Sequence, residues 1–522
     1  MNYKVLLTTS GIGSRLGDLT KYTNKSLVRI GKKPAISYIV ESYPEQTHFV
    51  VTVGYFGRHV RDFLEIAYPN RTFEFVEVNK YEGPGTSLGY SMLQAQEQLQ
   101  CPFIYHACDT LVPDSTIPLP DQNWIGVYKG EDSTSYASWK KMGEQSLVFE
   151  DKGALDFDFL HIGLVGIHNY AEFWKSLNYL YTQNPSDSTL NDCQAINQML
   201  SEAIPFTLTE FTSWFDIGNP SALQQARENI ADHFDVLEKT EESIFLFDDT
   251  VIKFFKDSEL VSRRVERAAL LTGLVPKILN HRENFYQYEY VTGDVYSEVV
   301  TPKDFAAFLQ WAKTHLWKEN HTVPAEVFSK NCRKFYYNKT LKRVADFYTQ
   351  TGIADEESVI NDEVVPSIKN ILAQIDFSTL CSGQATQFHG DCILENMIRT
   401  KEGYCLIDWR DSFGELTEAG DIYYDLAKLN HNLHVNHHIV YNDQFTIKKN
   451  ESVVNCDILR PDNLVKCQTV LFQFIEQNGY DVKKVEILTG LIWLNMSSLH
   501  HHTFNLFLSY YGRLNLHRAL SK

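Results

Sequence analysis

The feature that most constrains the fold is a series of short apolar runs in the first third of the chain, each the length of one strand. Residues 3–9, 49–53, 72–78 and 103–107 form these runs, with loops or helical patterns between them. Such runs, alternating with helices, are typical of strands buried inside an α/β sheet. The sequence therefore predicts an α/β region, which a helix over residues 221–234 closes.

A second pattern begins beyond that helix. Residues 243–247 and 250–255 predict two strands joined in a hairpin, and long helical patterns dominate after them. We see no internal repeat, low-complexity tract or Gly/Ser linker. We therefore expect two closely joined domains, over residues 1–232 and 238–522, the second of α+β type.

The charge and composition exclude several classes of partner. The formal net charge of -18 argues against nucleic acid and anionic membrane, because Lys and Arg supply most of the affinity for phosphate backbones. The sequence has no early segment that joins a basic start to an apolar run and no stretch of about 20 apolar residues, so it predicts neither a signal peptide nor a membrane span. The nine cysteines are scattered without a C-x-x-C pair, as expected for reduced thiols. We expect a cytoplasmic protein of undetermined oligomeric state.

A glycine-rich turn, S-G-I-G-S-R-L at residues 10–16, follows the first apolar run directly. Gly11 and Gly13 would let backbone N–H groups approach a phosphate chain, and Arg15 could hold its charged oxygens. Such turns are common after strands, so a plain turn is the alternative.

Further polar residues follow the turn in a fixed order. Lys25 lies in N-K-S-L, which precedes G-K-K-P at 31–34. Asp109 comes directly after an apolar run, and Asp216 lies in W-F-D-I-G-N-P. The whole string resembles the signature of the sugar-phosphate and choline-phosphate nucleotidyltransferase family.

This resemblance covers about residues 1–230 and implies a Rossmann-like, GT-A-like mixed sheet. By the same resemblance, Lys25 would contact the α-phosphate region, while Asp109 and Asp216 would hold Mg²⁺ against the nucleoside triphosphate. Mg²⁺ takes one or two carboxylates together with phosphate oxygens. A structural role as a loop or helix cap is the alternative for either aspartate.

The segment Y-E-G-P-G-T-S-L-G at residues 81–89 resembles the loop of that family that bears on the base and the substrate. Gly85 and Thr86 would bind nucleotide there, although a plain turn into a helix is also possible. A retaining glycosyltransferase could share the sheet, but C-D-T at 108–110 lacks the D-x-D pair of those enzymes. Base identity stays open.

The C-terminal half carries a second ordered string: F-H-G-D at 388–391, Asn396, L-I-D-W at 406–409 and G-D-I-Y-Y-D-L at 420–426. It resembles the core of the aminoglycoside phosphotransferase and choline kinase family, which has a protein-kinase-like fold. The resemblance implies that Asp391 orients or deprotonates an acceptor hydroxyl, and that Asn396 and Asp408 hold Mg²⁺ on ATP. In that family, an aspartate placed like Asp425 braces the catalytic loop.

Lys253 lies in an apolar strand, where its burial is costly unless it meets an anion such as an ATP phosphate. Glu266 is its expected ion-pair partner, and Glu259 is the alternative. No G-x-G-x-x-G loop precedes Lys253, which argues against a protein kinase more than against a small-molecule kinase. We expect the run His-His-His at 500–502 to be structural or surface-exposed.

Together the two resemblances imply a bifunctional enzyme. Its kinase would phosphorylate a small alcohol or sugar with ATP, and its nucleotidyltransferase would couple that phosphate to CTP or UTP with release of pyrophosphate. The product would be an activated donor for a surface polysaccharide such as a capsule. Two alternatives stay open, an NDP-sugar pyrophosphorylase with a sugar kinase and a nucleotidyltransferase with a non-catalytic binding module.

Overall fold

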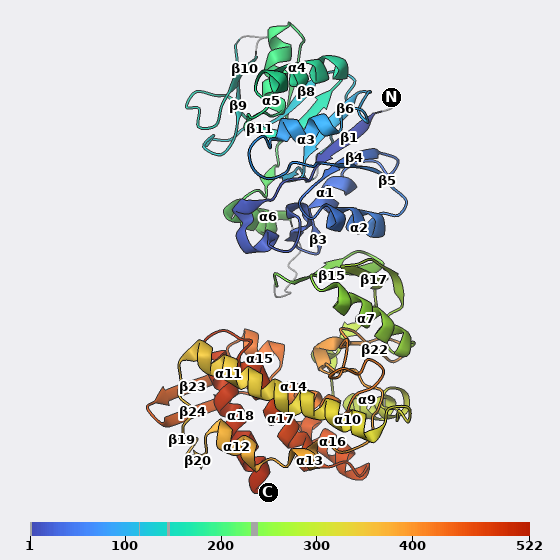
Figure 1. The fold of residues 1–522 in the computed structure, drawn as a ribbon, viewed down its shortest axis with the longest axis vertical. Coiled ribbons are helices and arrows are strands. Elements are labelled where there is room, and N and C mark those ends of the chain that lie inside the picture. Colours follow the sequence, from blue (N-terminus) through green and yellow to red (C-terminus); the bar gives the residue numbers. More distant parts are fainter. Residues whose placement is uncertain (1–2, 114, 143–146, 231–238) are drawn as a thin grey trace. The chain divides into compact units, whose positions relative to one another are not determined.

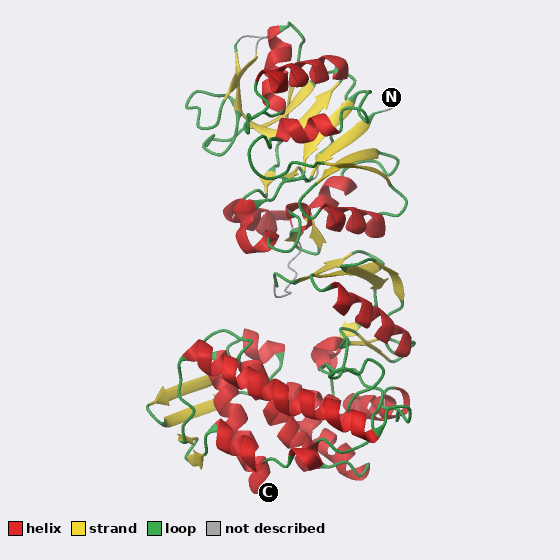
Figure 2. Cartoon of the chain, in the orientation of Figure 1, coloured by secondary structure: helices red, strands yellow, loops and turns green. Residues whose placement is uncertain are grey.

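The computed structural model describes residues 3–113, 115–142, 147–230 and 239–522. The chain divides into two compact units, Met1–Ser258 with Leu279–Tyr290 and Glu259–Ile278 with Val291–Lys522. Figure 1 labels their elements, and Figure 2 shows that helices make up most of the second unit.

The first unit is built on a mixed sheet with nine strands among the described residues. Seven of them lie in the order β10-β9-β11-β6-β1-β4-β5, and β8 pairs with both β11 and β12. The neighbours β6, β1, β4 and β5 are parallel, and β11 is antiparallel to β6. The four predicted strands are confirmed as β1, β4, β5 and β6. The strand bounds are β1 Lys4–Thr8, β4 His48–Val53, β5 Thr72–Glu77, β6 Phe103–Ala107, β8 Trp124–Tyr128, β9 Ser138–Lys141, β10 Leu147–Glu150, β11 Phe159–Ile167 and β12 Thr207–Glu210.

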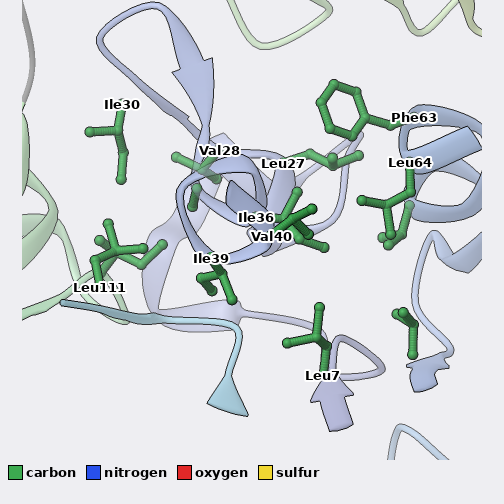
Figure 3. Close-up of a cluster of buried hydrophobic side chains, with 14 of the residues drawn as sticks. Leu7, Leu27, Val28, Ile30, Ile36, Ile39, Val40, Phe63, Leu64 and Leu111 are labelled. Carbon is green, nitrogen blue, oxygen red and sulfur yellow. The ribbon is translucent and has the colours of Figure 1, made fainter. Parts of the chain in front are cut away.

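Helices cover both faces of this sheet, because alternate residues of each strand point to opposite faces. In β1, Val5 and Leu7 pack into one core and Leu6 into the other. Part of the first core, including Leu7, Ile36 and Val40, is shown in Figure 3. The first core includes residues of α1 (Ala35–Glu41), α2 (Gly57–Ala67) and α6 (Pro220–Ile230), and the second those of α3 (Leu88–Gln94), α4 (Tyr170–Gln183) and α5 (Asp192–Ser201).

The closing helix α6 begins within one residue of its predicted start. Its predicted end at residue 234 lies outside the described residues. Two short strands, β7 (Thr110–Leu111) and β13 (Phe215–Asp216), pair antiparallel and join the two chain segments that carry the predicted aspartates.

The predicted hairpin is confirmed as β14 (Glu242–Leu246) and β15 (Thr250–Phe255), and β17 (Phe285–Glu289) pairs with β15. These strands pack within the first unit: the ring of Phe245 lies 5.4 Å from that of Phe63 on α2. The first compact unit thus extends beyond the hairpin. The domain limits at 232 and 238 stay a prediction from the sequence.

The second unit is mainly helical, around the long buried helix α17. Gly490 of α17 allows close contact, because a Cβ there would lie 2.5 Å from Cγ of Leu516 on α18. A π-helical turn joins α10 to α11, a feature frequent at functional sites. The helices are α7 Ser258–Leu270, α8 Tyr296–Val299, α9 Pro302–His315, α10 Ala325–Arg333, the π-helical turn η3 Lys334–Asn338, α11 Lys339–Thr351, α12 Ile368–Gln374, α13 Phe377–Leu380, α14 Ile422–His434, α15 His437–Tyr441, α16 Asp462–Gln477, α17 Val482–Ser497 and α18 Phe504–Ser521.

Small sheets complete the second unit: one has the strand order β18-β21-β22 and the other β20-β19-β24-β23. Within the described ranges, no helix has both the length and the apolar character needed to cross a bilayer. All nine cysteines are free thiols. The strand bounds are β18 Asp294–Val295, β19 Ser358–Ile360, β20 Glu363–Val365, β21 Met397–Arg399, β22 Tyr404–Leu406, β23 Phe445–Asn450 and β24 Val453–Ile458.

Candidate active sites

The first candidate site centres on an ion pair between Lys25 and Asp109, whose Nζ and Oδ2 atoms are 2.8 Å apart. Asp109 lies between β6, which ends at Ala107, and β7, which begins at Thr110, so the two strands fix its position. Asn24 fixes that of Lys25: the buried Asn24 amide donates to the backbone oxygens of Thr9 at 2.8 Å and Tyr55 at 2.7 Å. Two segments distant in sequence are thereby held at the end of the central strands.

Arg15 and Asp216 lie at the same point. A Cβ built on Gly218 would lie 2.9 Å from Oδ1 of Asp216, 3.1 Å from Nη2 of Arg15 and 3.5 Å from Oδ2 of Asp109. Three of the predicted charged residues therefore surround one glycine, which leaves room between them. The fourth, Lys25, joins them through Asp109.

The glycine-rich turn packs against this cluster. Gly13 has a positive φ of 69°, and a Cβ there would lie 2.9 Å from Cβ of Lys25. Gly11 is exposed, with open space where its Cβ would be. A side chain at residue 13 would thus displace Lys25, whereas residue 11 borders an open region.

The two carboxylates differ in their electrostatics. Burial opposes ionisation of Asp109, but the Lys25 ammonium outweighs it and lowers the pKa of Asp109; the same contact raises the pKa of Lys25. Burial, followed by the charge of Asp109, raises the pKa of Asp216. Two adjacent carboxylates of which one resists ionisation fit a divalent cation, because its charge offsets their repulsion.

Tyr136 is a member of this site that the sequence reasoning missed. Its hydroxyl donates to Oδ2 of Asp216 at 3.0 Å, while the backbone N–H of Gly218 donates to Oδ1 at 2.7 Å. Asp216 is therefore oriented from both sides. No motif surrounds Tyr136, so only the fold could reveal it, whereas Gly218 stands inside the W-F-D-I-G-N-P string.

The segment at 81–89 forms a loop before α3. Gly85 has a positive φ of 82°, and the Thr86 hydroxyl donates to the backbone oxygen of Gly83 at 2.8 Å. Throughout the described ranges, no hydrogen bond or ion pair joins Gly85 or Thr86 to Lys25 or Asp109. The loop begins beside the glycine-rich turn: a Cβ at Gly54 would lie between Ser10 and Tyr81.

The second candidate site lies in the second unit and centres on Asp391. Nδ2 of Asn396 lies 3.1 Å from Oδ2 of Asp391 and also donates to its backbone oxygen at 3.0 Å. Ile407, next to Asp408, donates its N–H to the backbone oxygen of Asn396 at 2.8 Å. Asp408 itself has a positive φ of 57°, a strained conformation that clusters at functional sites. Hydrogen bonds thus hold Asp391, Asn396 and Asp408 on two adjacent segments of the chain.

Asp425 accepts hydrogen bonds from the backbone of the loop that carries Asp391. Its two carboxylate oxygens accept the N–H groups of His389 and Gly390, each at 2.7 Å, and the Trp317 indole N–H at 3.0 Å. Asp425 is fully buried. Gly390 has a positive φ of 88°, and a Cβ there would lie 2.5 Å from that of Arg410. Asp425 therefore fixes the backbone of residues 389 and 390, and its role in a kinase-like catalytic loop stays a prediction.

Cations surround the carboxylates of the second site. Nζ of Lys428 lies 2.7 Å from Oδ1 of Asp391, and Nη1 of Arg264 lies 3.7 Å from Oδ1 of Asp408. Burial opposes ionisation of Asp391, but Lys428 outweighs it and holds the pKa of Asp391 far below its usual range. Sequence reasoning missed the role of Lys428, because its partner Asp391 lies on a distant segment of the chain.

The remaining predicted residues have these positions. Lys253 is buried in β15 of the first unit, and Glu266 is exposed on α7 of the second unit. Their pairing stays a prediction. Asp411, which follows the L-I-D-W string, pairs with Arg263 at 2.9 Å. The histidines at 500–502 lie in the loop between α17 and α18 rather than on a helix.

The N-terminal half of the chain, about 44% of it, is similar to solved structures of nucleotidyltransferases. CTP:phosphocholine cytidylyltransferase from Streptococcus pneumoniae is 18% identical, over 44% of this chain and 99% of that one, with a TM-score of 0.37. Inositol-1-phosphate CTP transferase from T. maritima is 17% identical, over 45% and 98%, with a TM-score of 0.35. UDP-glucose pyrophosphorylase from Acinetobacter baumannii is 17% identical, over 44% and 92%, with a TM-score of 0.36. No family model and no curated protein matches the chain.

Proposed function

We propose that the protein is a bifunctional enzyme that phosphorylates a small alcohol or sugar with ATP and then couples the new phosphate to CTP or UTP, releasing pyrophosphate. The observation that carries the proposal is the convergence of Arg15, Asp109 and Asp216 around Gly218, with Lys25 on Asp109. A paired cation and two adjacent carboxylates at the end of parallel strands suit transfer of a nucleotidyl group.

In the first site, the acceptor's phosphate oxygen would attack the α-phosphorus, and the bond to pyrophosphate would break. Lys25 and Arg15 would stabilise the charge that develops on the phosphates, and the N–H groups of residues 11–15 would position them. Asp109 and Asp216 would hold Mg²⁺, which when bound offsets charge on the triphosphate. Little covalent chemistry is needed from the protein.

In the second site, Asp391 would orient the acceptor hydroxyl toward the γ-phosphorus of ATP. Its lowered pKa suits hydrogen bonding to that hydroxyl better than early removal of the proton. Asn396 and Asp408 would hold Mg²⁺ on ATP. We thus propose a protein-kinase-like fold for this part, which makes the substrate that the first site uses.

The test is a mass-spectrometric screen of the purified full chain with Mg²⁺, ATP and one of CTP, UTP, GTP or dTTP, against a pool of amino alcohols, polyols, sugars and their acids. A nucleotide-linked product formed from an unphosphorylated acceptor, with CTP or UTP preferred, is the expected result. Product from pre-phosphorylated acceptors alone would overturn the kinase half, and no product with any nucleotide would overturn both halves. We propose that the product serves as a donor for a surface polysaccharide and that the protein acts in the cytoplasm.

A further inference from the structure

A cavity of about 260 Å³ opens beside Asp391 and Asp408 in the second unit. Its walls come from η3, α11, α14 and α17, and of these four elements only α14 overlaps a sequence motif. Pockets for drug-sized ligands usually begin near 300 Å³, so this one suits a small molecule. Its place beside Asp391 is where an acceptor hydroxyl would have to lie.

The cavity carries more positive than negative charge. Five cationic side chains and two carboxylates line it. Two of the cations face those carboxylates, Lys428 on Asp391 and Arg264 on Asp408. The other three have no carboxylate partner within the described part of the chain: they are Lys339, Arg343 and Arg410.

The pKa of Lys339 reflects its burial and the repulsion among these cations. Burial, followed by the charges of Arg410, Lys428 and Arg343, lowers the pKa of Lys339 to about 7, and the Asp391 carboxylate opposes that shift only weakly. Like charges gathered in a partly buried site destabilise one another unless an anion joins them. A ligand with a negative group would remove this repulsion.

The aromatic lining does not suit a cationic acceptor. Nζ of Lys339 lies 4.3 Å from the centre of the Phe335 ring and the Arg410 guanidinium lies 4.9 Å from it, so cations of the protein already use that ring. The part of the lining that comes from α17 is largely apolar, with Leu488, Leu491 and Met496. Tyr336 and Tyr424 also line the cavity, but both rings pack against Phe335, and the Tyr336 hydroxyl donates to Asp421.

We propose that the acceptor phosphorylated in the second unit is a small hydroxy compound that itself bears a carboxylate or a phosphate, bound by Lys339, Arg343 and Arg410. This proposal rests on the kinase half of the proposed function. The acceptor hydroxyl oxygen bonds to the γ-phosphorus of ATP, the bond between that phosphorus and ADP breaks, and the hydroxyl proton passes to Asp391 and then to solvent. The anionic group stays on the three cations and fixes which hydroxyl reacts.

The experiment measures binding and phosphorylation of matched compounds by the full chain. One set comprises glycerol, glycerate and glycerol 3-phosphate; the other comprises glucose, gluconate and glucose 6-phosphate; choline is the cationic member. Each is tested by titration calorimetry and with ATP and Mg²⁺. We expect kcat/KM for an acidic member to exceed that of its neutral counterpart at least about 100-fold. Comparing carboxylates with phosphates identifies the anion.

Single substitutions test which residues bind the negative group of the acceptor. We expect Lys339→Met and Arg343→Met each to raise the KM for the acidic acceptor about 10- to 100-fold and to leave the KM for ATP unchanged. Lys342→Met, an exposed lysine on the same helix, is the matched control and should change neither value. A rise in the KM for ATP instead would mean that these cations bind nucleotide, which would overturn the proposal.

The remaining outcomes separate this proposal from the kinase function. Preferred phosphorylation of neutral compounds or choline would overturn the anionic acceptor and leave the kinase standing. Acidic compounds that bind through Lys339 without being phosphorylated would support the anion site and overturn the kinase. If no acidic compound bound or reacted, the proposal would be wrong.

Discussion

The two candidate sites use the same pair of residue types in opposite surroundings. In the first unit Lys25 contacts Asp109 at 2.8 Å, and in the second unit Lys428 contacts Asp391 at 2.7 Å. Beside Asp109 lies a second carboxylate, Asp216, whereas Asp391 and Asp408 share their cavity with five cationic side chains. A site with spare carboxylates suits a substrate that arrives with a metal ion. A site with spare cations suits one that arrives with its own negative charge.

The largest expected effect concerns the lysine of the first site. Lys25→Met should lower nucleotidyl transfer about 10²- to 10³-fold, because a preorganised charge on the reacting phosphates is lost. Phosphorylation of the acceptor should not change. Both half-reactions are measured separately, with pre-phosphorylated acceptor and CTP for the first and ATP for the second. Lys21→Met, at an exposed neighbouring lysine, is the control; an equal loss there would contradict a specific role for Lys25.

The second prediction concerns Asp425, which holds the backbone of the second site. Asp425→Asn should leave a buried N–H of the 388–391 loop without an acceptor, at a cost of about 3 kcal/mol, or about 100-fold in local opening. Hydrogen exchange of amides in residues 388–391 measures this change. Asp376→Asn, at the exposed N-cap of α13, should leave their exchange unchanged. Unaltered protection in Asp425→Asn would show that the loop is held by other contacts.

The third prediction uses pH. Because the pKa of Lys339 is lowered to about 7, the free site loses that charge as the pH rises through 7. Affinity for an anionic acceptor should be highest below pH 7, and the KM for a carboxylate acceptor should rise about tenfold between pH 6.5 and 8.5. Lys339→Met should have a high KM that hardly depends on pH in this range. A KM that fell with rising pH in the unmodified protein would contradict this assignment.

The smallest expected effect concerns Tyr136, whose hydroxyl donates a hydrogen bond to Asp216. Tyr136→Phe removes one hydrogen bond, worth about 1 kcal/mol, which favours the ionised carboxylate. The Mg²⁺ concentration for half-maximal nucleotidyl transfer should therefore rise about fivefold, and phosphorylation should not change. Tyr179→Phe, at an exposed tyrosine of α4, serves as control. No change in the Mg²⁺ dependence would mean that Tyr136 does not orient Asp216 in the working enzyme.

The sequence predicted the strands and the motif residues that depend on local patterns of amino acids. The apolar run at 103–107 matches β6 residue for residue, since a strand buried on both faces has a continuous apolar signal. Arg15, Lys25, Asp109 and Asp216 were found through an ordered string, and the fold brings them together. Their roles in binding nucleotide and metal remain predictions.

Other features could not be predicted from the sequence, because they depend on packing between distant segments. Tyr136 reaches Asp216 across 80 residues, with no motif around it. Lys339 and Arg343 lie one helical turn apart on α11, a spacing that on its own indicates only a solvated face. Their position beside Asp391 follows from the packing of α11 against α17. The pattern of charges in a cavity is thus a property of the tertiary structure.

The central claim is that two separate sites catalyse two consecutive reactions, and Asp109→Ala and Asp391→Ala test it most directly, alone and mixed. With acceptor, ATP, CTP and Mg²⁺, Asp109→Ala should accumulate phosphorylated acceptor, and Asp391→Ala should form nucleotide product only from acceptor supplied already phosphorylated. Mixing the two variants should restore product from the unphosphorylated acceptor. Product formed by Asp391→Ala alone from that acceptor, at the rate of the unmodified protein, would contradict the claim.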